Sequence, residues 1–141
     1  MSVIIELANA VVAHLNSGLF GQAFTAQRQY LPLFDLPEMA TLHVTVVPKG
    51  MAISALDRLR DNYDFDIDVA VQQKTDGSPD QLDPLMTLVE QIADSFRTPK
   101  LATYPAARCT AVKNVPVYAQ EHLHEMRQFT SVLTLTFRVP R

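Results

Sequence analysis

The sequence predicts an α+β fold, in which a mainly antiparallel sheet carries two helices packed on one face. Two segments, 63–73 and roughly 128–139, alternate apolar and polar residues, which is typical of strands that bury only one face. Two others, 3–16 and 83–96, place apolar residues three and four positions apart, which predicts amphipathic helices. Strands and helices do not alternate regularly, so a parallel doubly wound sheet is not expected.

The first helix is predicted over residues 3–16. Ser2 is a suitable N-cap, and residues 16–18, Asn-Ser-Gly, form a stop signal. The apolar stripe that predicts the helix consists of Ile4, Leu7, Ala8, Val11 and Leu15.

Two strands are predicted between this helix and the strand at 63–73. Residues 23–31 favour a strand, and residues 42–47, which are rich in β-branched side chains, favour a stronger one. Pro48 is expected to close the second strand, because proline has no N–H to donate to a sheet ladder.

Residues 54–60 are expected to pair with the strand at 63–73 as a hairpin. We favour a three-residue loop, because it places each charged side chain opposite one of opposite charge and each apolar side chain opposite another apolar one. Each such cross-strand pair stabilises a sheet by roughly 0.2–1 kcal/mol. The pairs are Arg60 with Asp64, Leu59 with Phe65, and Arg58 with Asp66. The alternatives are a two-residue loop, which sets Arg60 opposite Tyr63, and one helical turn over 53–60.

The second half of the chain is predicted to hold a turn at 75–79, a helix and two strands. Asp83 is expected to cap the helix, with Pro84 in its first position. The apolar stripe of this helix consists of Leu85, Leu88, Val89, Ile92 and Phe96. Residues 108–118 predict a weaker strand. Pro116 indicates either that this strand lies at a sheet edge or that the strand ends there.

Composition predicts a folded chain with one domain, 1–141. A chain of 141 residues can bury roughly two-thirds of its unfolded surface. A hydrophobic fraction of 48% and a net charge of -3 exclude an intrinsically disordered chain. Twelve basic against fifteen acidic residues also exclude the plain basic profile of a stand-alone nucleic-acid-binding protein.

Neither an intrachain disulfide nor membrane insertion is expected. Cys109 is the only cysteine. The first residues lack the basic start of a signal peptide. The longest stretch without Asp, Glu, Lys or Arg, residues 7–27, contains too many polar residues to span a membrane. A soluble cytoplasmic protein is expected.

The sequence lacks the common motifs of catalytic and phosphate-binding sites. It has only four glycines, and neither a phosphate-binding loop nor a GxSxG or HExxH motif is present. We therefore expect no catalytic residue, cofactor or resident metal. Cys109 is expected to be idle, because no histidine lies at a spacing that indicates a thiol nucleophile. Arg28 is interpreted either as a contact with a neighbour or as an exposed strand position.

His122 and His124 form an H-x-H pair between Glu121 and Glu125. On a strand both imidazoles would project to one face and could hold a transition metal. The residues around them favour a polar hairpin tip instead, and the spacing assigns no third ligand. We expect a solvated loop at 119–127.

Asp64, Asp66 and Asp68 line one face of the predicted central strand. They could form an acidic wall or a divalent-cation site, although a cation would need further oxygens from elsewhere in the fold. The favoured interpretation is the solvent-exposed face of an amphipathic strand, with Arg58 and Arg60 as partners.

Several short, β-branched strands leave sheet edges that need protection. Pairing with another copy is one solution, and a closed ring of heterologous contacts achieves it without open-ended growth. An assembly protein is therefore favoured over an enzyme.

Six segments follow one another along nearly the whole chain. They are an opening helix at 6–16, the stretch 24–32, the stretch 42–48 with Leu36 before it, the strand 63–74, the helix 85–96 and the final strand 129–137. This order resembles the tail terminator (minor tail protein U-like) group of long-tailed bacteriophages, which are small neck or tail-completion proteins.

The resemblance implies a subunit of a ring, usually of six copies, in the neck of the virion. Such a ring sits on the last ring of tail tube protein, stops tube growth and offers the surface that joins the tail to the head connector proteins. It implies binding without catalysis, and DNA that passes through unread. A net charge of -3 suits this passage, because gripping DNA needs clustered Lys and Arg.

Two groups of residues are candidate contacts in such a ring. Lumen or subunit contacts are assigned to Asp64, Asp66, Asp68, Arg58 and Arg60. Contact with a neighbouring ring is assigned to Glu121, His122, His124 and Glu125 in the loop 119–127.

Three other functions stay open. The first is another neck ring, such as a head–tail connector or head-completion protein. The second is a small metal-dependent enzyme that uses His122, His124 and a carboxylate. The third is a bacterial binding module unrelated to phage.

Overall fold

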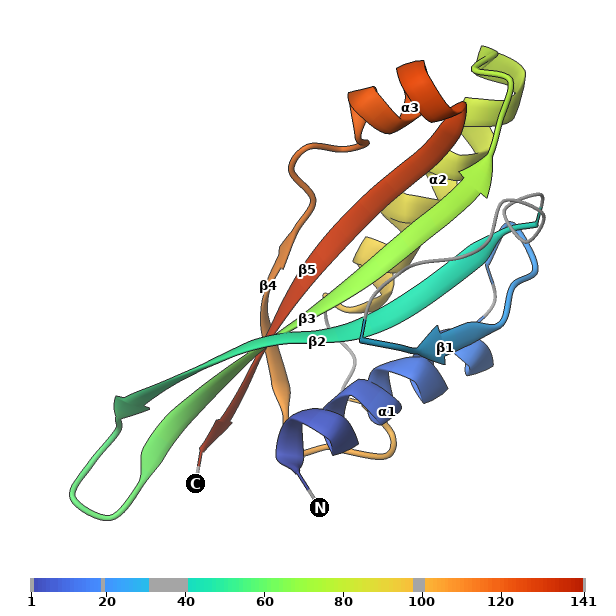
Figure 1. Ribbon diagram of the computed structural model, residues 1–141. Coiled ribbons are helices and arrows are strands. Elements are labelled where there is room, and N and C mark those ends of the chain that lie inside the picture. Colours follow the sequence, from blue (N-terminus) through green and yellow to red (C-terminus); the bar gives the residue numbers. More distant parts are fainter. Residues whose placement is uncertain (1, 19, 31–40, 98–100, 141) are drawn as a thin grey trace.

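A computed structural model of the chain describes residues 2–18, 20–30, 41–97 and 101–140 (Figure 1). For residues 125 and 126 the description covers the backbone alone. Along the described residues the elements are α1 (Val3–Ser17), β1 (Ala26–Arg28), β2 (His43–Ala55), β3 (Asp61–Lys74), α2 (Pro79–Ser95), β4 (Arg108–Lys113), α3 (Gln120–Met126) and β5 (Gln128–Pro140).

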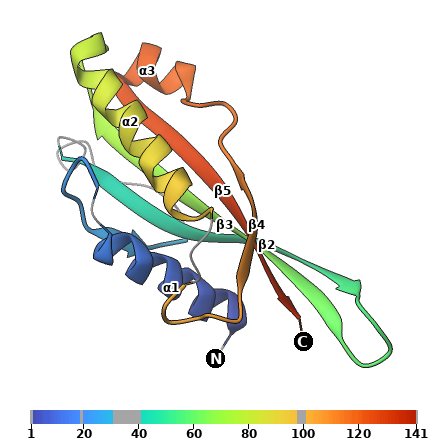
Figure 2. The same cartoon turned by 180° about the vertical axis from the view of Figure 1, so that it is seen from behind.

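The strands form one sheet in the order β1-β2-β3-β5-β4. Neighbouring strands are antiparallel, except that β1 runs parallel to β2. Both α1 and α2 lie on one face of the sheet, as the view in Figure 2 shows. The predicted α+β class, with a mainly antiparallel sheet and two helices on one face, is confirmed. A third helix, α3, was not predicted and lies against β5.

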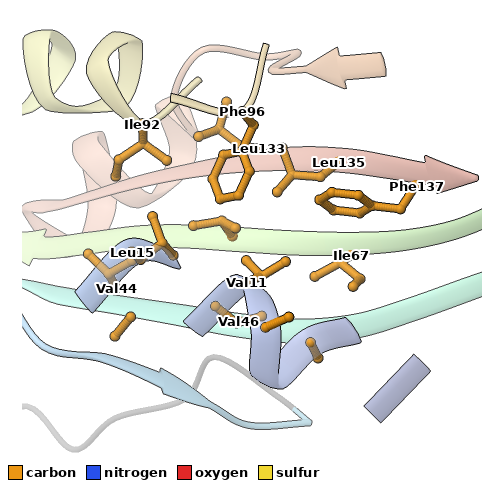
Figure 3. Close-up of a cluster of buried hydrophobic side chains, with 14 of the residues drawn as sticks. Val11, Leu15, Val44, Val46, Ile67, Ile92, Phe96, Leu133, Leu135 and Phe137 are labelled. Atoms are coloured by element: carbon orange, nitrogen blue, oxygen red, sulfur yellow. The ribbon is translucent and has the colours of Figure 1, made fainter. Parts of the chain in front are cut away.

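The hydrophobic core lies between these two helices and the sheet (Figure 3). β3 and β5 alternate as predicted, so that Ile67 and Val69 of β3 and Leu133 and Leu135 of β5 are fully buried. The helices contribute Leu7, Val11, Leu15, Leu88 and Ile92. Burying one such side chain contributes roughly 1.5–3 kcal/mol, so this layer fixes both helices on the sheet.

α1 and α2 meet where both helices end. His14 Nε2 lies 3.3 Å from Ser95 Oγ, and its ring centre lies 4.4 Å from that of Phe96. Partial burial lowers the pKa of His14, because the charged imidazole loses hydration, and the hydrogen bond with Ser95 offsets only part of this effect. Protonation of His14 therefore opposes the packing of the two helices.

α2 begins earlier than predicted. Ser78 is its N-cap and Pro79 occupies the first turn, whereas Asp83 and Pro84 lie inside the helix. The prediction of Asp83 as the cap is wrong, because Ser78 and Pro79 already provide a start. Gln81 reinforces it, since its Oε1 accepts hydrogen bonds from Thr75 Oγ1 and from the Asp76 N–H, both at 2.9 Å.

β2 is longer than predicted, and β1 is shorter. Pro48 does not end β2, which continues to Ala55 after a bulge between Pro48 and Gly50. β1 pairs only with residues 44–46 of β2, so that within the described residues the outer side of β2 is open beyond this point. Proline is tolerated on such an edge, because no outer ladder needs its N–H.

The β2–β3 hairpin turns at residues 56–60, so the favoured register and both alternatives are wrong. Asp66 lies opposite Gly50, and Asp64 lies opposite Ala52. Asp57 makes the turn locally, because its Oδ1 accepts the N–H groups of Leu59 and Arg60, each at 2.8 Å.

β4 lies at the other edge of the sheet, as predicted for the weaker strand. It pairs with β5 and, within the described residues, with no strand on its outer side. The strand ends at Lys113, before Pro116.

Candidate functional site

Asp64, Asp66 and Asp68, here called the acidic row, lie on the sheet face opposite to the two helices. Their partners come from β5, the neighbouring strand. Thr134 Oγ1 donates to Asp68 Oδ1 at 2.8 Å and Thr136 Oγ1 donates to Asp66 Oδ1 at 2.7 Å. Arg138 binds Asp64 through both carboxylate oxygens, at 2.9 and 3.1 Å. The guanidinium of Arg138 holds the pKa of the Asp64 carboxyl below its usual value.

Arg58 and Arg60 are not the partners of the acidic row, which corrects the prediction. Arg60 is held within the turn, where its Nη2 lies 3.1 Å from Asp57 Oδ2. Arg58 lies in the same turn, beyond the paired residues of β2 and β3. The cation nearest to the row from β2 is Lys49, whose Nζ lies 3.7 Å from Asp68 Oδ1.

The acidic row does not form a cluster suited to a metal ion. Both oxygens of Asp64 and one oxygen each of Asp66 and Asp68 already accept a hydrogen bond from β5. Across residues 2–18, 20–30, 41–97 and 101–140, no group of three or more His, Cys, Asp or Glu side chains could hold a metal ion. The arrangement instead places three carboxylates on an open sheet face, beside the cations Lys49 and Arg138.

The segment 119–127 contains helix α3, so the prediction of a polar hairpin tip is wrong. Two positions along a helix differ by about 200°, so His122 and His124 project in different directions. His122 Nδ1 lies 3.0 Å from Thr130 Oγ1, whereas His124 and Glu121 are exposed. The side chain of Glu125 lies outside the described residues.

Cys109 and Arg28 both have partners within the chain. Cys109 is half-buried on β4, with Sγ 3.6 Å from the Ala111 carbonyl oxygen. Burial raises the pKa of this thiol, so it stays protonated at neutral pH. Arg28 Nε donates to Asn9 Oδ1 at 2.9 Å, and its guanidinium lies 5.7 Å from the ring centre of Tyr30.

The most exposed apolar surface of the described residues was not predicted from the sequence. Residues 49–64, here called the hairpin arm, begin beside the first residues of α1 and carry β2 and β3 beyond the two helices (Figures 1 and 2). Four large apolar side chains of the arm are exposed: Met51 by 59%, Ile53 by 52%, Leu56 by 44% and Leu59 by 92%. The alternation of Met51 and Ile53 after Pro48 is the signal that could have revealed this strand.

The opposite border of the sheet carries a second exposed apolar group. β4 and the following residues 114–118, here called the β4 edge, expose Val115 by 77% and Val117 by 42%. Asn114 holds this segment against β5, because its Nδ2 donates to the Val132 carbonyl oxygen at 2.7 Å. A hollow of about 260 Å³ beside β4 is lined by Phe96, Arg97, Cys109, Thr110, Ala111 and Val112.

The two borders also differ in charge. Residues 49–68, which include the hairpin arm and the acidic row, contain three basic and five acidic side chains. Residues 101–120, which include the β4 edge, contain two basic side chains, Arg108 and Lys113, and no acidic ones. An acidic border and a basic border therefore lie on opposite sides of one sheet.

Comparison with known proteins assigns no family. No family model matches the sequence, and no curated protein matches it. Within the described ranges, no helix is long and apolar enough to cross a membrane.

Proposed function

We propose that this chain is a virion structural protein of the phage neck, a ring-forming tail terminator that caps the tail tube and provides the surface for joining the head. The observation that carries the proposal is the pair of exposed apolar borders at opposite sides of one sheet. A monomer leaves both uncovered, and uncovered sheet edges with apolar side chains favour pairing with another chain.

When a contact between two different surfaces is repeated from copy to copy, it gives a closed ring if the rotations between successive copies add up to a full turn. A tail terminator needs such a ring, because its two ends must meet different partners, the tail tube protein and the head connector proteins. The order of segments along the chain supports this choice over other ring proteins.

The acidic row suits the lining of the passage. It lies on the open sheet face, where its carboxylates hold Lys49 and Arg138 and so make these cations less available to the phosphate backbone of DNA. DNA then passes through the ring without sequence-specific contacts. α3 is the proposed contact with the neighbouring ring, because Glu121 and His124 are exposed on it.

A second neck function is the nearest alternative. A head–tail connector or head-completion ring would use the same exposed borders. Finding the chain in isolated heads, and not in isolated tails, favours that alternative. A metal-dependent enzyme is less favoured, because His122 and His124 diverge on α3. Metal analysis of the purified protein tests it, since an enzyme of this kind would hold about one metal ion per chain.

The proposal is tested by adding the purified chain to polymerising tail tube protein. We expect tubes of limited length that carry a ring at one end in electron micrographs. Tubes that grow as long as they do without the chain, with no density at their ends, contradict the proposed function.

A further inference from the structure

We propose that the hairpin arm of one copy adds to β4 of the next copy as a further antiparallel strand, so that one sheet continues from subunit to subunit. This inference names the contact on which the proposed ring rests. The occupant of both exposed borders is thus a second copy of this chain.

Both strands have a free outer side. Beyond residues 44–46, the outer side of β2 has no strand beside it within the described residues, and the same holds for β4. Residues 50–55 contain no proline, so every second one of them, whose N–H and C=O point away from β3, can offer both backbone groups to a partner. Strand addition to such an edge satisfies main-chain donors and acceptors, which side-chain contacts alone do not.

The direction of the strands allows the sheet to continue. In the order β1-β2-β3-β5-β4 each of the last three steps is antiparallel, so β2 and β4 of one chain run in opposite directions. A following copy in the same orientation places its β2 antiparallel to the β4 that it meets. The helices of both copies then lie on the same side of the joined sheet.

The apolar side chains meet a suitable surface in this arrangement. Met51 and Ile53 lie opposite Phe65 and Tyr63, and therefore on the helix side of the sheet. On β4 the helix side carries Cys109 and Val112, next to the hollow of about 260 Å³. Strand addition lays the two exposed apolar side chains of the arm along this hollow, where they lose contact with water.

The charged side chains meet on the other side of the sheet. Arg108 and Lys113 lie opposite Arg138 and Thr134, on the face of the acidic row, and both are exposed. Between them and Asp66 and Asp64 of the next copy would lie Gly50 and Ala52 of β2, which have little or no side chain. Long basic side chains can therefore reach across β2.

Asp66 is oriented to receive such a side chain. Its Oδ1 accepts the hydrogen bond of Thr136, and its Oδ2 lies 4.0 Å from the position that a Cβ of Gly50 would take. The second oxygen thus faces the free edge of β2, and no hydrogen bond to it occurs within the described residues. A guanidinium or ammonium group from the β4 edge of another copy complements this oxygen.

Two double variants test the contact by native mass spectrometry. Met51→Lys with Ile53→Lys disables the arm, and Arg108→Asp with Lys113→Asp disables the β4 edge. All four side chains are exposed, so both variants are expected to fold, which circular dichroism checks. We expect the unaltered chain to form oligomers and each variant alone to stay a monomer of 15.7 kDa. Glu90→Lys, at an exposed position of α2, is the control that keeps the oligomers.

Mixing the two variants gives the decisive result. The arm variant keeps an intact β4 edge, and the β4 variant keeps an intact arm, so one contact remains between unlike copies. We expect a 1:1 dimer of twice the chain mass and nothing larger. A mixture that stays monomeric overturns the proposal, as does a variant that still forms the full oligomer alone.

A second measurement uses the single cysteine. In Met51→Cys or Ile53→Cys the new thiol is expected to lie beside Cys109 of the next copy, within disulfide distance for one of the two. Oxidation then yields a ladder of linked chains, whereas a two-fold contact yields dimers alone. The added substitution Cys109→Ser must abolish the ladder.

The two proposals fail in different ways. An unaltered chain that is monomeric at high concentration, yet limits tube length, overturns this contact and leaves the proposed function standing. Oligomers with the predicted mixing behaviour that do not cap tubes overturn the proposed function and leave the contact standing.

Discussion

Two regions of the same sheet differ in what covers their apolar face. Beneath α1 and α2, the apolar side chains of β3 and β5 are at most 4% exposed from Phe65 to Val71 and from Leu133 to Val139. In the hairpin arm, side chains on the same face of β2 are more than half exposed, as at Met51 and Ile53. Both regions alternate apolar and polar residues, but only the first region is covered by helices of the same chain. The alternation of apolar and polar residues along a strand therefore predicts which face is buried. It does not predict whether that face is covered by the same chain or by another chain.

The largest expected effect comes from removing side chains in the covered region. Ile67→Ala should lower the free energy of unfolding by about 2–5 kcal/mol, because it leaves a cavity in the packed layer. Ile53→Ala in the arm should change it by no more than about 0.5 kcal/mol in the monomer. Urea unfolding of both variants measures the difference, and similar losses would remove the distinction between the regions.

Reversing the charge of the acidic row should weaken assembly. The variant Asp64→Lys, Asp66→Lys, Asp68→Lys places like charges opposite the basic β4 edge, and loss of such contacts weakens association more than about tenfold. Sedimentation measures the oligomers. A matched control, Asp80→Lys, Asp83→Lys, Asp94→Lys, makes the same charge change on exposed positions of α2 and should leave assembly intact. If the first variant still formed intact rings, the acidic row would not contribute to assembly.

Acid should loosen the covered region. Because burial lowers the pKa of His14, the unfolded chain binds the proton more tightly than the folded chain does. The contribution of His14 to stability is complete above its ordinary pKa of 6.5 and is lost as the pH falls below this value through the folded pKa. Thermal unfolding at pH 7.5 and 5.5 should show a drop that His14→Gln reduces. An equal drop in both proteins would assign the effect elsewhere.

The smallest effect on stability is expected at α3. Glu121→Lys with His124→Glu changes exposed positions, so the unfolding free energy should stay within about 0.5 kcal/mol. Rings should still form and cap tubes, but joining to heads should fail if α3 meets the neighbouring ring. Mixing capped tails with heads and counting joined particles measures this. If tails of this variant joined heads normally, α3 would not be the contact with the neighbouring ring.

The regular elements could be predicted because their patterns are local. The alternation of β3 and β5 and the stripes of α1 and α2 fixed the fold class and the buried faces. The position of the acidic row on the open face also followed from this alternation.

The partners of the acidic row could not be predicted from nearby residues. Charge matching favoured Arg58 and Arg60, but Asp57 binds Arg60 in a local turn, and Thr136 and Arg138 arrive from a strand about 70 positions later. Such long-range pairs leave no trace in local spacing.

Proline and histidine also misled for physical reasons. Pro48 predicts a strand end, yet β2 continues past it, because an open edge needs no N–H there. Residues two positions apart, such as His122 and His124, project to the same face of a strand but in different directions from a helix. Because these residues lie on α3, their spacing does not indicate a shared metal site.

Hydrogen exchange at the two borders tests the central claim most directly, which is that copies of the chain cover the uncovered region. Amides of residues 50–60 and 108–117 are followed by mass spectrometry while the protein concentration is raised. The account predicts that both segments become protected together, and that Met51→Lys with Ile53→Lys removes this protection from both. Exchange that is independent of concentration in both segments would contradict the claim.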